Sequence, residues 1–197
     1  MTVLGDRVET LRRALERLHE IEAPLQAAAG SIAWSLGAGG KLLAAGNGGS
    51  AAEAQHLTGE FLGRLDAARE RRALPAVALH ADTSTLTAVG NDYGFDSVFS
   101  RQVEALGCPN DVLVVLSTSG ASTNLVRAVE AASDRGMISV GLLGPGSRPL
   151  HERCTHVLAV PTDSPQAVQE CHLVLVHALV ELAEDLLSDT VSEHHGS

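Results

Sequence analysis

The chain has 197 residues, 45% of them hydrophobic and 19% charged, a length and composition that allow one globular domain with a sizeable core. The formal net charge of −10 and the few aromatic residues (one Trp, one Tyr and three Phe) argue against nucleic acid as a partner, because such binding needs clustered Lys and Arg or stacking platforms. Three cysteines without CxxC spacing, a polar N-terminus without a signal-peptide pattern and the lack of an apolar run of about 18 residues predict a cytoplasmic protein with no membrane partner.

The first predicted element is a leading helix over residues 6–36, in which apolar side chains recur at helical spacing. Pro24 predicts a break within it, and the glycines of residues 37–40 predict its end. This helical segment, residues 1–40, precedes the alternation of strands and helices. We therefore expect its apolar stripe to pack on the domain or on a second subunit.

Short apolar runs then alternate with helical stretches, which is typical of a parallel sheet covered by helices on both faces. Strands are predicted at residues 41–45, 76–79, 112–116, 138–142 and 157–160. Helices are predicted at residues 50–62, 83–91, 95–106, 122–135, 148–153 and 165–187. Residues 41–187 are thus an expected α/β core with ligands at the carboxyl ends of its strands, and residues 188–197 an expected flexible tail.

A glycine-rich turn, residues 46–50 (GNGGS), follows the first predicted strand and leads into a helix. Its small residues let a ligand approach the backbone closely, and the free N–H groups of a helix N-terminus attract anions. The same helix carries His56 and Glu60, which are four residues apart and therefore share one face. This arrangement predicts a phosphorylated substrate held at the turn, with chemistry further along the helix.

Gly46, Gly48 and Ala51 also fit the G-x-G-x-x-A fingerprint of dinucleotide-binding proteins. That fingerprint requires an acidic residue about 20 positions later, at the end of the second strand. Asp66 has the spacing but precedes the second predicted strand, and Asp82 comes too late, so this interpretation is the weaker one. A tight turn without any ligand is a further alternative.

The third predicted strand is followed by a second polar turn, residues 117–124 (STSGASTN), before another helix begins. Hydroxyl groups, backbone N–H groups and a helix N-terminus together predict a phosphate site that contains no basic residue. The alternative is that Ser122 or Thr123 only caps the helix, but one cap explains one hydroxyl and not four.

The otherwise apolar last helix carries three polar candidates, Gln169, His172 and His177. Together with His56 and Glu60 they predict an acid–base or metal site, because His and carboxylate ligands suit zinc or a similar divalent ion. The alternative is that these histidines only pack in the core. Gln169 and His177 lie about 12 Å apart along a straight helix, so a shared ion requires side chains that lean toward each other or ligands from different subunits.

Three further features have simple structural interpretations. Asp82 follows the second predicted strand and either binds sugar hydroxyls or caps the helix after it. The charged run at residues 66–72 (DAARERR) predicts a solvated loop. Cys171 predicts buried packing rather than a nucleophile, because no base is placed for it.

Five motifs occur in order between residues 4 and 187. They are Gly46-Asn47-Gly48-Gly49-Ser50; Gln55-His56 with Glu60 and Gly63-Arg64; Gly90-Asn91-Asp92-Tyr93-Gly94; Ser117-Thr118-Ser119-Gly120; and Gln169-Glu170-Cys171-His172 with His177. With this ordered and specific set the chain resembles the phosphoheptose isomerase family, the sedoheptulose 7-phosphate isomerase branch of the SIS (sugar isomerase) fold.

The resemblance implies an α/β three-layer sandwich with a five-stranded parallel sheet, of flavodoxin-like or Rossmann-like type, and a homotetramer with sites between subunits. It implies conversion of sedoheptulose 7-phosphate to D-glycero-D-manno-heptose 7-phosphate through an enediol, with Glu60 as base and His177 as acid. The implied ligands of one Zn²⁺ per subunit are His56, Glu60, Gln169 and His177. The implied phosphate contacts are Ser50, Ser117, Ser119 and Ser122. The other implied substrate contacts are Asn47, Gly48, Gly49, Glu60, Arg64, Asp82, Thr118 and Gln169.

The chain departs from the family pattern at Gln166, where an acidic residue usually precedes the glutamine of the last helix by three positions. The missing carboxylate is one that could orient a sugar hydroxyl or assist proton transfer. The alternative function is a non-catalytic SIS protein that binds a sugar phosphate and acts as a regulator, such as one that binds the bacterial replication initiator. That branch lacks the glutamate and histidine found here at Glu60 and His177, and their presence favours the enzyme.

Overall fold

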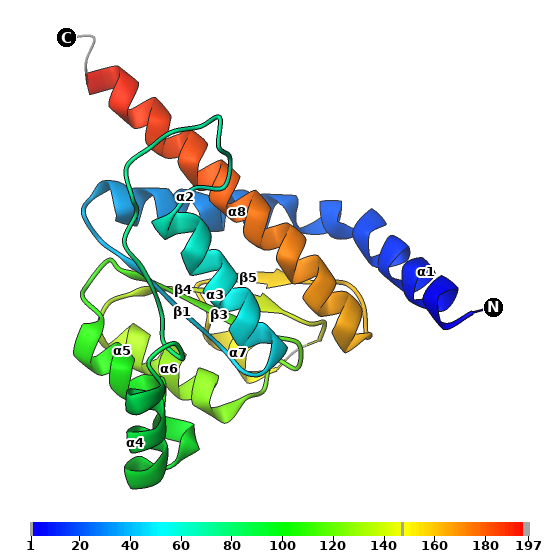
Figure 1. Ribbon diagram of the computed structural model, residues 1–197, viewed down its shortest axis with the longest axis horizontal. Helices are drawn as coiled ribbons and strands as arrows, with labels where there is room; N and C mark the ends of the chain where they lie inside the picture. The colour runs from blue at the N-terminus through cyan, green and yellow to red at the C-terminus, as the bar shows by residue number, and fades with distance from the viewer. Residues whose placement is uncertain (1, 147, 195–197) are drawn as a thin grey trace.

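Residues 2–146 and 148–194 are described by the computed structural model, in which helices alternate with the strands of one sheet (Figure 1). The strands are β1 (Leu42–Gly46), β2 (Ala76–Ala78), β3 (Val112–Ser117), β4 (Ile138–Leu143) and β5 (His156–Ala159). All of them pair in parallel, in the order β2-β1-β3-β4-β5. The five-stranded parallel sheet that the resemblance implies is therefore confirmed.

Helices cover both faces of this sheet and make the three layers expected of the fold (Figure 1). The helical elements are α1 (Val3–Glu16), η1 (Leu18–Ile21), α2 (Glu22–Gly37), α3 (Gly49–Leu62), α4 (Thr83–Tyr93), η2 (Phe95–Ser97), α5 (Ser100–Leu106), α6 (Thr123–Asp134), α7 (Pro149–Arg153) and α8 (Pro165–His194). Successive strand residues point to opposite faces. Val114 packs in the core under α2, α3 and α8, whereas its neighbour Val115 packs under α5, α6 and α7. A strand buried on both faces needs apolar residues at every position, which is why the strands read as continuous apolar runs.

The leading helical segment breaks earlier than the sequence predicts. α1 ends at Glu16, η1 follows, and α2 begins at Glu22. Pro24 lies in the first turn of α2, where its missing N–H has no intrahelical partner to lose. The predicted break in this segment is therefore confirmed, but it lies at residues 17–21, just before Pro24, which fits inside the first turn of α2.

Two other predicted boundaries also differ from the structure. The helix predicted over residues 95–106 is divided into η2 and α5, with the buried side chains of Val98 and Phe99 between them. The last helix, predicted to end at residue 187, continues as α8 to His194 without an intervening Gly or Pro, and so includes the first part of the predicted tail. Residues 195–197 of that tail lie outside the described part of the chain. Within the described ranges, no helix has the length and apolarity that a membrane span requires.

The strand order places the functional turns at one point of the sheet. β1 lies between β2 and β3 in the sheet. After β1 the chain continues into α3 on one face of the sheet, and after β3 it continues into α6 on the opposite face. Sheets of this order bind ligands in the crevice at the carboxyl ends of the two strands where the connection reverses. The glycine-rich turn after β1 and the hydroxyl-rich turn after β3 border that crevice.

Candidate active site

The turn after β1 presents a helix N-terminus with no capping side chain. α3 begins at Gly49, and its N-cap residue Gly48 has a φ of 58°. A Cβ on Gly46 would lie 2.4 Å from the carbonyl oxygen of Ser50, so this turn closes only around glycine. The N–H groups of Ser50 and Ala51 donate to the carbonyl oxygens of Asn47 and Gly48 at 3.1 Å, so the N–H of Gly49 and the hydroxyl of Ser50 are the donors that this turn can offer an anion.

The loop after β3 is organised by its own hydroxyl groups. Ser117 Oγ accepts the N–H of Gly120 at 3.1 Å, and Ser119 Oγ accepts the N–H of Ala121 at 3.3 Å. Ser122 occupies the N-cap position of α6, but its side chain makes no capping hydrogen bond in the described structure. The capping alternative therefore does not account for Ser122, and its hydroxyl stays available beside the N-terminus of α6.

A cavity of about 230 Å³ adjoins this loop. Thr118, Ser119 and Ala121 line one part of it, and Arg148 and Asp163 line another. The sequence predicts a phosphate site without a basic residue, so Arg148 is an addition that only the fold reveals. The available signal was topological: Arg148 follows the carboxyl end of β4, which pairs with β3.

The two turns are joined by a pair of amides. Asn47 Nδ2 donates to Asn124 Oδ1 at 2.9 Å, and Asn124 Nδ2 donates back to Asn47 Oδ1 at 2.9 Å. Asn47 belongs to the turn after β1 and Asn124 to the first turn of α6, and Asn124 is only 3% exposed. Asn124 lies in the predicted phosphate loop without an assigned role, and the structure shows that it holds the two turns together.

α3 and α8 run side by side in the same direction, so their side chains meet in sequence (Figure 1). Gln169 Nε2 donates to Ser50 Oγ at 3.5 Å, near the start of both helices. Further along, the Nε2 atoms of His56 and His177 lie 2.8 Å apart. The parallel packing therefore brings the last helix to both the glycine-rich turn after β1 and the predicted His/Glu pair. Between these contacts, the buried His172 lies 3.7 Å from Glu53.

His56, Glu60 and His177 form a compact cluster at this helix interface. One ligand atom from each lies within 4.8 Å of the others, and His56 Nε2 is 3.4 Å from Glu60 Oε1. Two imidazole nitrogens and a carboxylate oxygen are a donor set that suits a divalent ion with an open coordination position. Gln169 is about 12 Å away along α8 and lies against Gly49 and Ser50. The structure thus brings together three of the four expected ligands and places Gln169 beside the turn after β1.

Comparison with known proteins identifies the family. A family model described as the SIS domain matches residues 8–144. A phosphoheptose isomerase from Rhodospirillum rubrum is 50% identical over 87% of this chain and 90% of its own length, and one from Solidesulfovibrio magneticus is 45% identical over 98% and 94%. A solved phosphoheptose isomerase structure from Francisella tularensis superposes with a TM-score of 0.87 at 37% identity, covering 94% of this chain and 100% of that one.

The chain belongs to the phosphoheptose isomerase family of SIS-domain proteins. It is therefore an isomerase, and the alternatives of a dinucleotide enzyme and a non-catalytic regulator are set aside. In this family member, Glu60 and His177 each place a ligand atom within 4.8 Å of the other, although they come from different helices.

Two predicted substrate residues of this phosphoheptose isomerase family member have other partners in the chain. Asp82 caps α4, because its carboxylate accepts hydrogen bonds from the N–H groups of Ser84 at 3.0 Å and Thr85 at 3.1 Å. The pKa of Asp82 is lowered, mainly by the hydrogen bond from the Thr85 hydroxyl and further by these backbone bonds. The capping interpretation of Asp82 is the one that the structure shows. Arg64 is about half exposed and forms an ion pair with Glu70.

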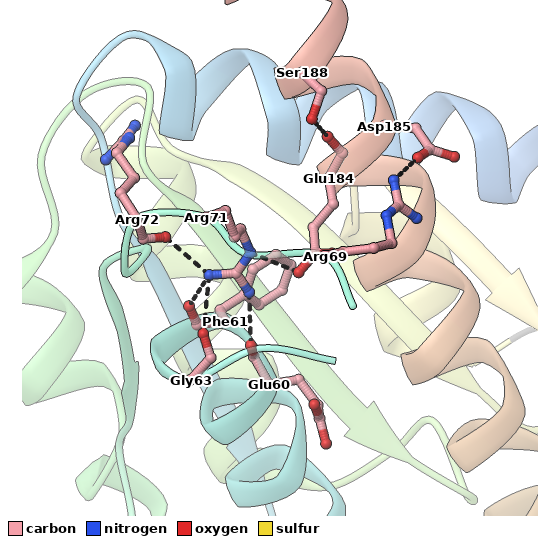
Figure 2. A network of polar contacts seen from close by, with 9 residues as sticks. All are labelled: Glu60, Phe61, Gly63, Arg69, Arg71, Arg72, Glu184, Asp185 and Ser188. Atoms are coloured by element: carbon pink, nitrogen blue, oxygen red, sulfur yellow. Dashed lines mark hydrogen bonds and ion pairs between the residues drawn. The ribbon is translucent and has the colours of Figure 1, made fainter. Parts of the chain in front are cut away.

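The charged run at residues 66–72 is not wholly a solvated loop, and that prediction is wrong for Arg71. Its side chain is only 16% exposed and forms an ion pair with Glu184 of α8, whose side chain is 4% exposed (Figure 2). Sequence reasoning missed this pair because the loop is rich in charge and the partner lies 113 residues away.

The packing interpretation of Cys171 is confirmed. The residue is fully buried, and burial raises the pKa of its thiol to about 11, so the reactive thiolate is suppressed at neutral pH.

Gln166, at the start of α8, accepts a hydrogen bond from Arg7 Nη1 at 3.3 Å. The residue that replaces the usual acidic group thus links α8 to α1.

Proposed function

We propose that the protein converts sedoheptulose 7-phosphate to D-glycero-D-manno-heptose 7-phosphate, the first step toward nucleotide-activated heptose. The observation that supports this most directly is the approach of Glu60 and His177, from two different helices, within one cluster. His56 of that cluster is about 9 Å along α3 from Ser50, a span comparable to an extended sugar phosphate. Substrate held by its phosphate at the turn therefore reaches the cluster with its carbonyl end.

The phosphate end of the proposed site uses neutral donors and helix N-termini. The hydroxyls of Ser50, Ser117, Ser119 and Ser122 are its proposed contacts. Their supports are the uncapped starts of α3 and α6. Because the chain carries a net charge of −10, the general field does not attract a phosphate, and these local donors carry the binding. Arg148 adds a positive charge at the adjoining cavity.

The chemical end moves a proton between neighbouring carbons of the sugar. This step needs a carboxylate base beside the C–H bond and a donor beside the carbonyl oxygen. We assign Glu60 to the first role and His177 to the second. Binding energy from the phosphate positions the reacting carbons against both groups. Asn47 and Thr118 are proposed sugar contacts at the crevice between the two ends.

Zinc is the proposed cofactor, at one ion per subunit. His56, Glu60 and His177 would hold it and leave a coordination position open. A bound zinc ion supplies Lewis-acid polarisation of a carbonyl oxygen. Gln169 of the same chain lies beside Ser50, so in this proposal it contacts the substrate rather than the ion.

We also propose a cytoplasmic homotetramer with its sites close to subunit interfaces. Apolar side chains along α1 support it: Val3, Leu4 and Val8 are 82%, 73% and 58% exposed in the single chain. Exposed apolar stripes of this kind commonly mark interfaces, and homo-oligomers bury the same patch on each subunit.

The test is to incubate the purified protein with sedoheptulose 7-phosphate and to follow aldose formation by NMR. We expect D-glycero-D-manno-heptose 7-phosphate to accumulate, and none with the Glu60→Gln variant on the same time scale. If the wild-type protein binds sedoheptulose 7-phosphate but forms no aldose, with or without added zinc, the proposed function is wrong.

A further inference from the structure

Arg71 ties the C-terminal end of α3 to α8 (Figure 2). Its Nη2 donates to the carbonyl oxygen of Glu60 at 2.7 Å, and its Nη1 donates to the carbonyl oxygens of Phe61 at 3.0 Å and Gly63 at 3.1 Å. Its Nε donates to Glu184 Oε1 at 2.6 Å. The Arg71 guanidinium group therefore donates hydrogen bonds both to the carbonyl oxygens at the end of α3 and to the buried carboxylate of Glu184.

These contacts concern the turn that carries Glu60. The last carbonyl groups of a helix have no intrahelical donor, and an end without such donors frays. Glu60 lies in the last turn of α3, which ends at Leu62. Figure 2 shows its carbonyl oxygen bonded to Arg71 while its carboxylate points away from Arg71. A cation at this end also complements the negative end of the helix dipole.

The partner carboxylate lies on the helix that carries His177. Glu184 is seven residues after His177, which is about two helical turns and the same face of α8. The Arg71–Glu184 pair therefore joins α3 and α8 just beyond the cluster of His56, Glu60 and His177. We propose that Arg71 is a positioning residue that holds the Glu60 turn at a fixed distance from His177. This inference rests on the proposed function, in which Glu60 and His177 act on one substrate.

A neighbouring ion pair provides a matched control. Arg69 pairs with Asp185, which joins the same loop to the same helix (Figure 2). These two side chains are 37% and 52% exposed, and within the described part of the chain the Arg69 side chain bonds Asp185 and no carbonyl oxygen of α3. Arg69→Gln therefore removes a link between loop and α8 but leaves the end of α3 unchanged.

The experiment compares Arg71→Lys, Glu184→Gln, Glu184→Ala and Arg69→Gln with the wild-type protein. Lysine keeps the charge but lacks the planar fork that reaches several acceptors. Glutamine at position 184 keeps an acceptor for Arg71, and alanine removes it. The readouts are kcat and KM for sedoheptulose 7-phosphate and hydrogen exchange of the peptide over residues 57–64, with the peptide over β3 as internal reference.

We expect Arg71→Lys and Glu184→Ala to lower kcat by about tenfold to a hundredfold with KM nearly unchanged, because misplacement of a reacting group affects the transition state. The peptide over residues 57–64 should exchange faster while β3 stays protected. Glu184→Gln should recover most of both properties, and Arg69→Gln should match the wild type. If Arg71→Lys does not fold, the comparison of the two Glu184 variants decides.

Wild-type kcat and exchange in both Arg71→Lys and Glu184→Ala would overturn the inference, as would equal losses in Arg69→Gln. A fall in kcat with unchanged exchange at residues 57–64 would also overturn it, since Arg71 would then act by another route. Failure of the proposed function is a separate result: the wild-type protein itself would produce no aldose, while hydrogen exchange would still report whether Arg71 holds the end of α3.

Discussion

The Nε2 atoms of His56 and His177 lie 2.8 Å apart, although 121 residues separate them in the chain. The two side chains meet because α3 and α8 pack in parallel, from Ser50 beside Gln169 onward. Two imidazole nitrogens at this distance share one proton in a hydrogen bond, and the carboxylate of Glu60 is the third group of the cluster. The three side chains of this cluster therefore all come from the two helices α3 and α8.

The first prediction concerns the metal. Metal analysis of the purified protein should find about one divalent ion per chain, and His177→Ala should lose most of it because a ligand is removed. His19→Ala is the control, since His19 is exposed in η1 and its ring bonds the carbonyl oxygen of Glu16. Full activity after exhaustive chelation would argue against a catalytic metal.

The second prediction concerns Glu60. Glu60→Gln should lower turnover by about 10²-fold or more, because glutamine cannot accept the proton. Folding and phosphate binding should persist, since the phosphate turn lies at the other end of α3. Steady-state kinetics and a phosphate-analogue titration measure both properties. Near-normal turnover would remove Glu60 from the role of base.

The third prediction concerns the glycine turn. Gly46→Ala places a Cβ 2.4 Å from the carbonyl oxygen of Ser50, and we expect the free energy of unfolding to fall by about 1–3 kcal/mol. Gly30→Ala is the matched control in α2, because its Cβ meets no atom within 4 Å. It should raise the free energy of unfolding by about 0.5–1 kcal/mol. Urea denaturation of both variants is the measurement, and equal effects would contradict the steric argument.

The fourth prediction concerns Asp82 as a helix cap. Hydrogen bonds from Thr85 and Ser84 hold its pKa in the folded protein below the reference value of 3.8. The unfolded chain therefore binds more protons, so the stabilisation by Asp82 is present above pH 3.8 and is lost as the pH falls through the folded-state pKa. Asp82→Ala should lower the thermal midpoint at pH 7 more than at pH 3.

Asp82→Asn is the control for that experiment. Asparagine is a good N-cap, so this variant should keep the midpoint at pH 7 and lose part of its dependence on pH. Turnover should stay close to the wild-type value in both variants if capping is the role of Asp82. A large loss of turnover in Asp82→Asn at unchanged stability would instead support a contact with the sugar.

The fold was largely predictable because each strand is a short apolar run between helical stretches. The pair His56 and Glu60 was predictable as well, since it depends only on helical spacing. Its approach to His177 was not derivable from local pattern, because the packing of α3 on α8 decides it. Three residues were missed for the same reason: Arg71, Asn124 and Arg148 each act through segments far away in the sequence.

The reciprocal amide bonds between Asn47 and Asn124 have a consequence for how the pocket can evolve. Each side-chain amide donates one hydrogen bond to the other and accepts one from it. Changing either residue alone therefore leaves one donor and one acceptor of the other without a partner, beside the buried position of Asn124. We therefore expect a substitution at one position to be tolerated best when the other position changes with it. Residues that line the surrounding crevice can change separately, while this pair of hydrogen bonds keeps the turn after β1 and the first turn of α6 together.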